Sequence, residues 1–398
     1  MIKNRDIIVT GIQPWDIDIG SNCKNIAEEF SKHNRVLYVN APLDSISAVK
    51  EKDSPKIQKR KRIIAGKEDG LVEIKKNMWN LFPATKIKSI NWIKSVPLFD
   101  FFNKKNNKKF AAEIQKAIDR LGFKNVILFT DSDMFRSLYL KEYLEPEMWI
   151  YYIRDNLITQ DYFKKHGTRT EAQLIAKADF VASNSGYLAD YARKFNPNAF
   201  MVGQGCDLSM FSDNDGKIEI PDDIQKIGKP IIGYIGYLTA MRLDIEVLEH
   251  IAKSHPEWNV VLIGPEDDVF KNSNLHNIKN VIFFGFRQLE QLPGYIKGFD
   301  IALNPQAINE LTIGNYPRKI DEYLAMGKPT MGTKTDFMNY FAEHCYLPAN
   351  KEEYVEMIEK ALKENNQELE KSRKAFANQH TWENNVKNIY DLIERFSK

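Results

Sequence analysis

Short apolar runs alternate with amphipathic stretches along most of the chain, and this alternation predicts the order of strands and helices. The runs that have the length of buried strands span residues 6–11, 35–39, 125–130, 148–153, 180–183, 231–237, 260–264, 281–285 and 301–305. Between them, apolar residues recur at helical spacing, as at Ile245, Leu248 and Ile251. The clearest helices fall at residues 171–178, 187–194, 291–297, 351–364 and 382–396. This order predicts an α/β protein with two doubly wound parallel sheets.

A polar stretch with several Gly and Pro residues separates the two halves of this pattern. The chain has 398 residues, which is enough for two domains of ordinary size. We therefore predict a first domain at residues 1–212, a linker at 213–229, a second domain at 230–380 and a last helix at 381–398.

Residues 50–109 interrupt the alternation and carry a net charge of +11, whereas the whole chain carries +2. Residues 50–67 predict an exposed basic loop or hairpin. Residues 86–109 mix aromatic side chains such as Trp92 and Phe101 with lysines and contain no long apolar run. This mixture is typical of a segment that lies in a membrane interface. It is equally typical of a helix whose aromatic residues pack into the core, and the sequence leaves both interpretations open.

Composition limits the class and the compartment of the protein. Apolar residues make up 43% and charged residues 28%, as in globular proteins. Cys23, Cys206 and Cys345 are too few and too far apart for a disulfide framework or a Cys-type metal site, which favours a reducing compartment. No apolar signal region follows Met1 and no run of 18 apolar residues occurs, so we predict a cytoplasmic protein. The basic region lacks any nucleic-acid-binding motif.

The stretch 309–330 has the most specific chemistry. Pro317 suits a first helical turn and Gly327 suits a helix end. On the helix between them, Lys319 and Glu322 lie three residues apart on one face. A cation beside a carboxylate at a helix start could bind a ligand that carries phosphates and a hydroxylated ring. An ordinary amphipathic helix with a surface ion pair has the same spacing, so the spacing alone leaves both possibilities open.

This stretch resembles the nucleotide-sugar-binding segment of GT-B fold glycosyltransferases, in particular the family 4-like enzymes of bacterial capsule, teichuronic-acid and exopolysaccharide synthesis. The matching residues are Asn309 to Thr312, Asn315 and the run from Pro317 to Pro329, with Tyr316 as one extra residue. The resemblance implies two Rossmann-like domains that face each other across a cleft. It also implies that the first domain binds the acceptor, the second binds the sugar nucleotide, and the helix at 381–398 crosses back to the first domain.

The resemblance implies a donor site in the second domain. Arg242 and Lys319 are the predicted partners of the phosphates, aided by the N-terminus of a helix that Gly236 would open. Glu322 is predicted to accept hydrogen bonds from the ribose hydroxyls. The other predicted nucleotide contacts are Tyr237, Gly264, Phe286, Arg287, Thr312 and Asn315.

The predicted transfer uses no metal and no cofactor, since the nucleoside-diphosphate sugar is a co-substrate. Asp131 and Asp133 have the Asp-x-Asp form of metal-dependent transferases, but they fall in the first domain, away from the predicted donor site. We therefore predict no metal site.

A carboxylate of the first domain is the predicted general base for the acceptor hydroxyl. Asp155 follows a buried strand and is the first candidate, and Asp16 and Asp18 are the next. Each of them could instead cap a helix or a turn. Glu310 is predicted to contact the donor sugar, because it is the nearest substitute for a second Glu that many family members carry. Because this second Glu is not at its usual position here, the resemblance leaves both a retaining and an inverting mechanism open.

Three functions fit these features. The first is a glycosyltransferase that moves a sugar from a UDP- or GDP-linked donor to a glycan or undecaprenyl-linked acceptor. For this function, residues 86–109 would contact the inner face of the membrane. The alternatives are a sugar-nucleotide epimerase of the same fold and a non-catalytic nucleotide-sugar-binding assembly protein.

Overall fold

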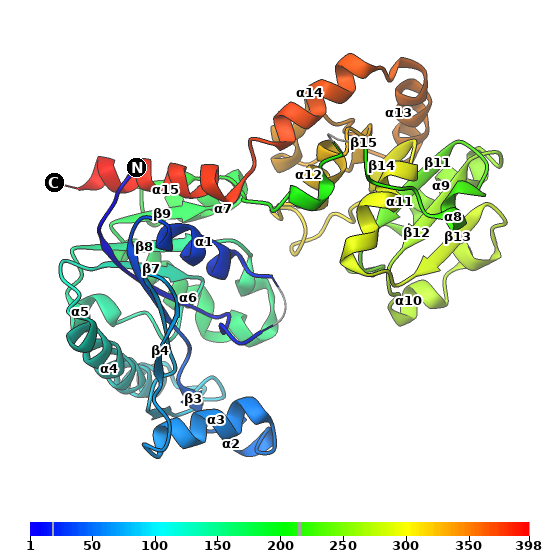
Figure 1. The fold of residues 1–398 in the computed structure, drawn as a ribbon. Coiled ribbons are helices and arrows are strands. Elements are labelled where there is room, and N and C mark those ends of the chain that lie inside the picture. The colour runs from blue at the N-terminus through cyan, green and yellow to red at the C-terminus, as the bar shows by residue number, and fades with distance from the viewer. Residues whose placement is uncertain (18–19, 214–215, 398) are drawn as a thin grey trace. The chain divides into compact units, whose positions relative to one another are not determined.

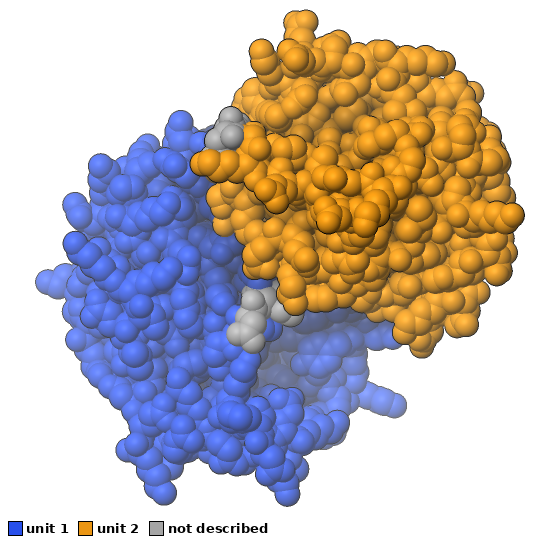
Figure 2. Space-filling view, turned by 45° about the vertical axis from the view of Figure 1, so that its right-hand side comes forward, with its two compact units in different colours: residues 1–203, 382–398 blue, residues 204–381 orange. Residues whose placement is uncertain are grey.

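The chain forms two compact units in the computed structural model, which describes residues 1–17, 20–213 and 216–397. Unit 1 comprises Met1–Gly203 together with the chain from Trp382 onward, and unit 2 comprises Gln204–Thr381 (Figure 2). The chain therefore passes from one unit to the other twice. Each unit has its own sheet and its own apolar core.

Unit 1 is built on an eight-stranded sheet with the order β10-β9-β8-β7-β1-β2-β5-β4 (Figure 1). All neighbours in it are parallel except β4 and β5. The strands are β1 Asp6–Gly11, β2 Arg35–Val39, β4 Leu71–Lys75, β5 Met78–Leu81, β7 Ile127–Asp131, β8 Met148–Ile153, β9 Phe180–Ser183 and β10 Ala199–Met201. The short strands β3 Leu43–Asp44 and β6 Lys86–Ile87 form a separate parallel pair.

Alternate residues of these strands face opposite layers of helices, as the two-residue repeat of a strand requires. Ile7 and Val9 pack with α1 and α15, whereas Ile8 packs with α4, α5, α6 and α7. The helices of unit 1 are α1 Asn22–Ser31, α2 Ser47–Lys50, α3 Pro55–Ile64, α4 Val96–Leu121, α5 Leu140–Leu144, α6 Asp161–Lys177, α7 Gly186–Arg193 and α15 Trp382–Phe396. The C-terminal helix thus completes one layer of the N-terminal unit.

The region between β2 and β7 differs most from the prediction. The expected basic loop or hairpin at residues 50–67 is wrong, because residues 55–64 form the helix α3, which begins at Pro55 and buries Ile57 and Ile63. In the second half of the region, residues 96–109 form the start of α4, a helix of 26 residues, and residues 86–95 contain β6 and a loop. No helix of the described residues is both long and apolar enough to cross a bilayer.

Unit 2 is built on a five-stranded parallel sheet with the order β13-β12-β11-β14-β15. Its strands are β11 Ile231–Ile235, β12 Asn259–Ile263, β13 Val281–Gly285, β14 Ile301–Asn304 and β15 Thr330–Gly332. Its helices are α8 Asp222–Gln225, α9 Ile245–Ser254, α10 Asp268–Lys271, α11 Leu292–Gly298, α12 Lys319–Ala325, α13 Lys351–Glu364 and α14 Gln367–Ala377. The helices α9 and α13 pack on one face of the sheet (Figure 1).

The stretch predicted as a linker, residues 213–229, belongs to unit 2, and the boundary falls earlier, at Gly203. Its described residues are held by side chains of the second unit. Lys297 Nζ lies 2.6 Å from Asp213 Oδ2, and Tyr295 Oη donates to Asp223 Oδ2 at 2.8 Å. The polar composition of this segment therefore did not indicate a flexible linker. The segment is the first part of unit 2 and packs against it.

Candidate functional site

A cavity of about 310 Å³ opens in unit 2 at the carboxyl ends of β11 and β14. Open α/β sheets bind ligands at this edge. The segment that includes α12 forms another wall of the cavity. Of the predicted nucleotide contacts, those that line the cavity are Gly236, Arg242, Thr312, Asn315, Lys319 and Glu322.

Lys319 extends its amine to the end of β11. Its Nζ donates to the hydroxyl of Tyr234 at 2.7 Å and lies 4.5 Å from the centre of that ring. A Cβ atom on Gly236 would lie 2.9 Å from the same Nζ, and Gly236 has a φ of +145°. Gly264 also has a positive φ, and a Cβ atom there would lie 1.9 Å from the carbonyl oxygen of Gly236. Glycine at position 236 therefore leaves room for the amine, and glycine at position 264 lets the two strand ends pack closely.

Glu322 faces the cavity one helical turn after Lys319. Burial raises the pKa of Glu322, against the opposing effect of the Arg318 and Lys319 cations. Among the described residues, no side chain or backbone amide donates a hydrogen bond to its carboxylate. A half-buried carboxylate without a partner costs free energy, so this group is available to hydroxyl donors of a ligand.

The loop after β14 holds the other side of the cavity. Asn309 Oδ1 accepts from the amides of Leu311 and Thr312, and the Thr312 hydroxyl donates to the carbonyl of Ala307. Thr312 therefore shapes the turn, although its residue lines the cavity. Arg242 lies on the facing loop, where its backbone carbonyl accepts from the amide of Ala307 at 2.9 Å. Its exposed guanidinium has no ion pair among the described residues.

Some predicted contacts lie outside the cavity. Arg287 binds Tyr295 Oη at 2.7 Å and Asp223 at 3.2 Å, so its charge is used within the fold. Phe286 and Tyr237 are exposed, and neither lines the cavity. Glu310 is exposed and does not line it either.

The helix predicted to begin at Gly236 does not form there. The helix α9 begins nine residues later, and the Asp244 side chain accepts from the amides of Glu246 and Val247. This carboxylate satisfies two amides of the first turn and places a negative charge there, so the N-terminus of α9 is a poor site for a phosphate. The positive charge at the cavity therefore comes from side chains.

A buried cluster behind α12 was not predicted. Asp321 is fully buried beside the two cavity-facing residues of the helix. Its carboxylate lies 2.7 Å from His380 Nδ1 and accepts from Cys206 Sγ at 3.3 Å. These partners fix the rotation of α12, and with it the direction of Lys319 and Glu322. No sequence signal joins the three residues, because they lie far apart along the chain.

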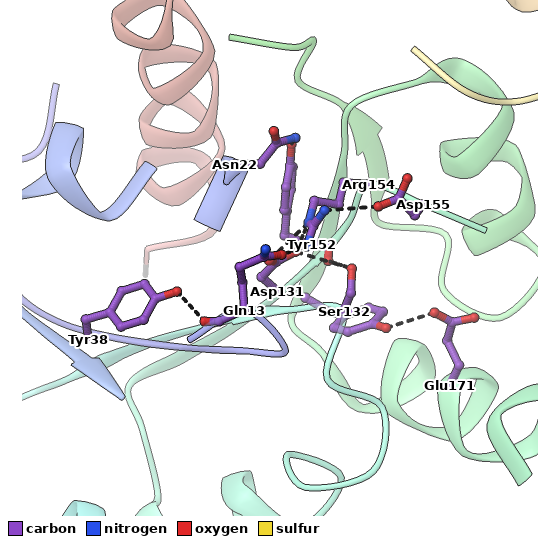
Figure 3. A network of polar contacts seen from close by, with 10 residues as sticks. Gln13, Asn22, Tyr38, Asp131, Ser132, Tyr152, Arg154, Asp155 and Glu171 are labelled. Carbon is purple, nitrogen blue, oxygen red and sulfur yellow. Dashed lines mark hydrogen bonds and ion pairs between the residues drawn. The ribbon is translucent and has the colours of Figure 1, made fainter. Parts of the chain in front are cut away.

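A second polar site lies in unit 1 where β1, β7 and β8 end (Figure 3). Arg154 Nε donates to Asp131 Oδ1 at 3.0 Å, its Nη1 donates to Asp155 Oδ2 at 3.0 Å, and its Nη2 donates to Gln13 Oε1 at 3.1 Å. Asp131 is fully buried, whereas the side chain of Asp155 is 43% exposed. The guanidinium therefore orients Asp155 at the sheet edge.

Two other carboxylates that the sequence singled out in the first unit have cationic partners. Asp16 lies 3.5 Å from Arg60, and Asp133 lies 2.8 Å from Arg136. Asp18 lies outside the described residues. No group of three or more His, Cys, Asp or Glu side chains in the described part of the chain is arranged to hold a metal ion.

Glu171 is a buried carboxyl of α6 that also appears in Figure 3. Tyr151 Oη donates to it at 2.8 Å and Tyr191 Oη at 3.2 Å. Burial raises the pKa of Glu171 from 4.5 to about 7, despite the two tyrosine hydroxyls. It lies inside the apolar layer between helices and sheet, so its role is structural.

Comparison with known proteins shows which family the unit with the Lys319 and Glu322 cavity resembles. Residues 217–381, most of unit 2, match the family model described as Glycosyl transferases group 1. Over 244 residues the chain is 26% identical to TuaH of Bacillus subtilis (strain 168), which is named for a glycosyltransferase of teichuronic acid biosynthesis. That match covers 58% of this chain and 60% of TuaH.

Two solved structures share the whole fold. The Anabaena protein HepE in complex with UDP is 12% identical, with a TM-score of 0.66 over 98% of this chain and 100% of its own. Sucrose-phosphate synthase from Thermosynechococcus elongatus is 14% identical, with a TM-score of 0.65 over 99% of each chain. The predicted fold class, two Rossmann-like domains of the GT-B type, is confirmed, and so is the resemblance to glycosyltransferases.

Proposed function

We propose that this chain is a glycosyltransferase of bacterial surface polysaccharide synthesis, which moves a sugar from a uridine-diphosphate sugar to a glycan or lipid-linked acceptor. The group 1 glycosyltransferase domain and the relative named for teichuronic acid synthesis support the reaction class. Structural neighbours in complex with UDP and with UDP-glucose support the uridine nucleotide. The observation that carries the proposal is the cavity that joins Lys319, Arg242 and Glu322.

In this proposal the cavity binds the nucleotide half of the donor. Lys319 and Arg242 contact the diphosphate, and Glu322 accepts from the ribose hydroxyls. During transfer the bond between the anomeric carbon and the diphosphate oxygen breaks, so negative charge grows on the leaving group. Fixed cations at that position stabilise the transition state more than the ground state, and the reaction then needs no metal ion.

The acceptor would meet the edge of unit 1 that carries Asp155. An acceptor hydroxyl forms the new bond to the anomeric carbon and gives up its proton. In an inverting reaction Asp155 would accept that proton, and Arg154 would keep the carboxylate in place. In a retaining reaction the same carboxylate would orient the hydroxyl.

The exposed lysines and aromatic residues of 86–109 would bring the protein to the inner face of the cytoplasmic membrane. Trp92 and Phe101 are exposed, as are Lys104 and Lys105. Basic and aromatic side chains together favour the interface of an anionic leaflet. This placement would give the enzyme access to a lipid-linked acceptor.

The test of the proposal is donor binding and turnover. UDP should raise the melting temperature of the protein more than GDP does, and the shift should persist in excess EDTA. Release of UDP from UDP-sugars should be detectable by a coupled assay and should increase when a matching acceptor is added. Failure of every nucleotide to bind would overturn the proposal, and an epimerised sugar nucleotide as the product would replace it by the epimerase.

A further inference from the structure

The cavity of unit 2 contains one more cation than the sequence predicted. Arg318, the residue before Lys319, also lines it. Among the residues that the structure describes, the charged ones in its wall are Arg242, Arg318, Lys319 and Glu322. Three cations therefore surround the proposed nucleotide site together with a single carboxylate.

The guanidinium of Arg318 is not used within the fold. Arg318 is exposed, and its guanidinium makes no hydrogen bond or ion pair with any described residue. Glu322 follows four residues later, a spacing at which a cation and a carboxylate on one helix often pair. The two groups do not pair here, although burial raises the pKa of Glu322 and Arg318 is the charge that opposes this most. Both charges are therefore available to a ligand.

The position of Arg318 does not favour the helix either. The helix α12 begins at Lys319, so Arg318 is its N-terminal cap residue, and its side chain makes no capping hydrogen bond. Cations stabilise the C-terminal end of a helix and are unfavourable at the N-terminal end. Residues that break such a rule without a gain to the fold are expected at functional sites. A cation that the fold neither pairs nor favours indicates a negatively charged ligand.

The charge of the nucleotide changes during the proposed reaction. In a nucleoside-diphosphate sugar each of the two phosphates carries one negative charge, and Lys319 and Arg242 are proposed to contact them. When the bond between the anomeric carbon and the β-phosphate oxygen breaks, the electron pair of that bond stays on the oxygen. The released UDP carries a third negative charge at pH 8, since the second pKa of a terminal phosphate is about 6. The third cation matches a charge that appears only as the reaction proceeds.

We propose that Arg318 binds the β-phosphate oxygen that gains this charge as the leaving group departs. The acceptor oxygen forms the new bond to the anomeric carbon and its hydroxyl proton is released, so the diphosphate ends with one more negative charge. Tyr234 already holds the amine of Lys319 at 2.7 Å, whereas the unpaired guanidinium of Arg318 can follow the oxygen. An interaction that strengthens only as the bond breaks lowers the barrier without tighter substrate binding.

The inference rests on the proposed function and assigns the residue that distinguishes UDP from the intact sugar nucleotide. Calorimetric titration of the full chain at pH 8 with UDP and with its β-methyl ester tests it. The ester keeps the nucleoside and both phosphates but lacks the third charge, and its use does not depend on which sugar is transferred. Arg318→Met should weaken the binding of UDP at least tenfold and the binding of the ester less than threefold.

Two further variants separate the charge of Arg318 from other effects. Arg318→Lys keeps the charge and should restore most of the affinity for UDP. Lys360→Met is the matched control, because Lys360 is exposed on the same unit outside the cavity, and it should change neither affinity. In turnover with a sugar-nucleotide donor, Arg318→Met should lower kcat/KM at least tenfold, because the lost interaction belongs to the transition state.

The outcomes distinguish this inference from the proposed function. Equal losses of affinity for UDP and for the ester in Arg318→Met would overturn the inference and leave the proposed function in place. An Arg318→Lys variant that binds UDP no better than Arg318→Met, or an unchanged kcat/KM in Arg318→Met, would do the same. A wild type that binds neither nucleotide would overturn both.

Discussion

At the scale of single residues, the donor cavity depends on how closely Lys319 approaches the end of β11. The amine can reach that position because Gly236 has no side chain in its way. The same amine is held by Tyr234. A ligand phosphate can therefore meet a cation that is already in place, which limits the entropy lost on binding.

Lys319→Met should weaken UDP binding by about 1.5–3 kcal/mol, the usual contribution of a hydrogen bond to a charged group. The measurement is calorimetric titration with UDP. Lys279→Met is the matched control, since Lys279 is an exposed lysine of the same unit outside the cavity. Equal affinities of the wild type and the Lys319 variant would remove the lysine from the site.

Asp155→Asn should lower turnover by a factor of about 10² to 10⁴ if the carboxylate accepts the proton of the acceptor. UDP affinity should stay unchanged, because Asp155 lies in the other unit. Steady-state kinetics together with UDP titration separate the two effects. Full turnover in this variant would transfer the role to another group.

Glu171 predicts a pH dependence of stability. Its pKa is about 7 in the folded protein and 4.5 in its ordinary state, so the folded protein binds the proton more tightly. Its contribution is therefore present at low pH and is lost as the pH rises from about 4.5 to about 7. Between pH 5 and pH 8 the free energy of unfolding of the wild type should fall by on the order of a few kcal/mol relative to that of Glu171→Gln. Urea unfolding at each pH measures both values.

The control for this experiment is Glu145→Gln, since Glu145 is exposed on the same unit. Its stability difference from the wild type should not change with pH. If the Glu171 variant shows the same constant difference, the folded and unfolded proteins bind this proton equally.

The sequence predicted some site residues well and others poorly, for a physical reason. Lys319 and Glu322 lie three residues apart on one helix, so local periodicity alone puts them on the same face. Arg287 follows a strand of the same sheet, yet its guanidinium turns to Asp223 and Tyr295. Such partners come from distant segments, and no local pattern reveals them.

At the scale of elements, the strands that were predicted lie within two residues of the observed ones, because short apolar runs have few alternatives in an α/β protein. The strands β4, β5 and β10 were not predicted. The helix α3 was predicted as a loop or hairpin. For the residues that begin α4, the sequence left open whether they form a helix packed on the core or lie in a membrane interface. Several buried positions of α4 are polar, among them Asn103, Asn106 and Asn107, which weakens its apolar period. The side-chain amides of Asn106 and Asn107 bond to loops that the sequence does not place.

The exposed face of α4 leads to a prediction about membranes. The protein should sediment with anionic liposomes at low salt and leave them at high salt. Each lysine near an anionic surface contributes about 1 kcal/mol within a Debye length. Replacing the exposed lysines of this helix by Gln should reduce the bound fraction in a sedimentation assay; they are Lys104, Lys105, Lys108 and Lys109.

The matched control replaces four exposed lysines of unit 2 by Gln, namely Lys226, Lys279, Lys360 and Lys371. It changes the net charge equally and should leave the bound fraction close to that of the wild type. Equal losses in both variants would mean that net charge alone, rather than α4, attracts the protein to the vesicles.

At the scale of the whole molecule, the two units have separate cores, so a ligand of one unit should stabilise that unit selectively. UDP at 100 times its dissociation constant adds about 2.7 kcal/mol to the native state that binds it. In hydrogen exchange, amides of β11, β12 and β14 should gain protection, and those of β8 and β9 should gain much less. Equal gains throughout would show that the units open together.

The core of unit 1 depends on α15, a helix that is made only after unit 2. It contributes Val386, Ile389, Tyr390 and Ile393 to the core that also contains Phe30 of α1. The ribosome delivers α1 well before α15, so the layer that these two helices share stays incomplete while unit 2 is being made. Unit 1 therefore cannot complete its core before α15 has been made, and until then the nascent chain presents an apolar surface suited to chaperone binding.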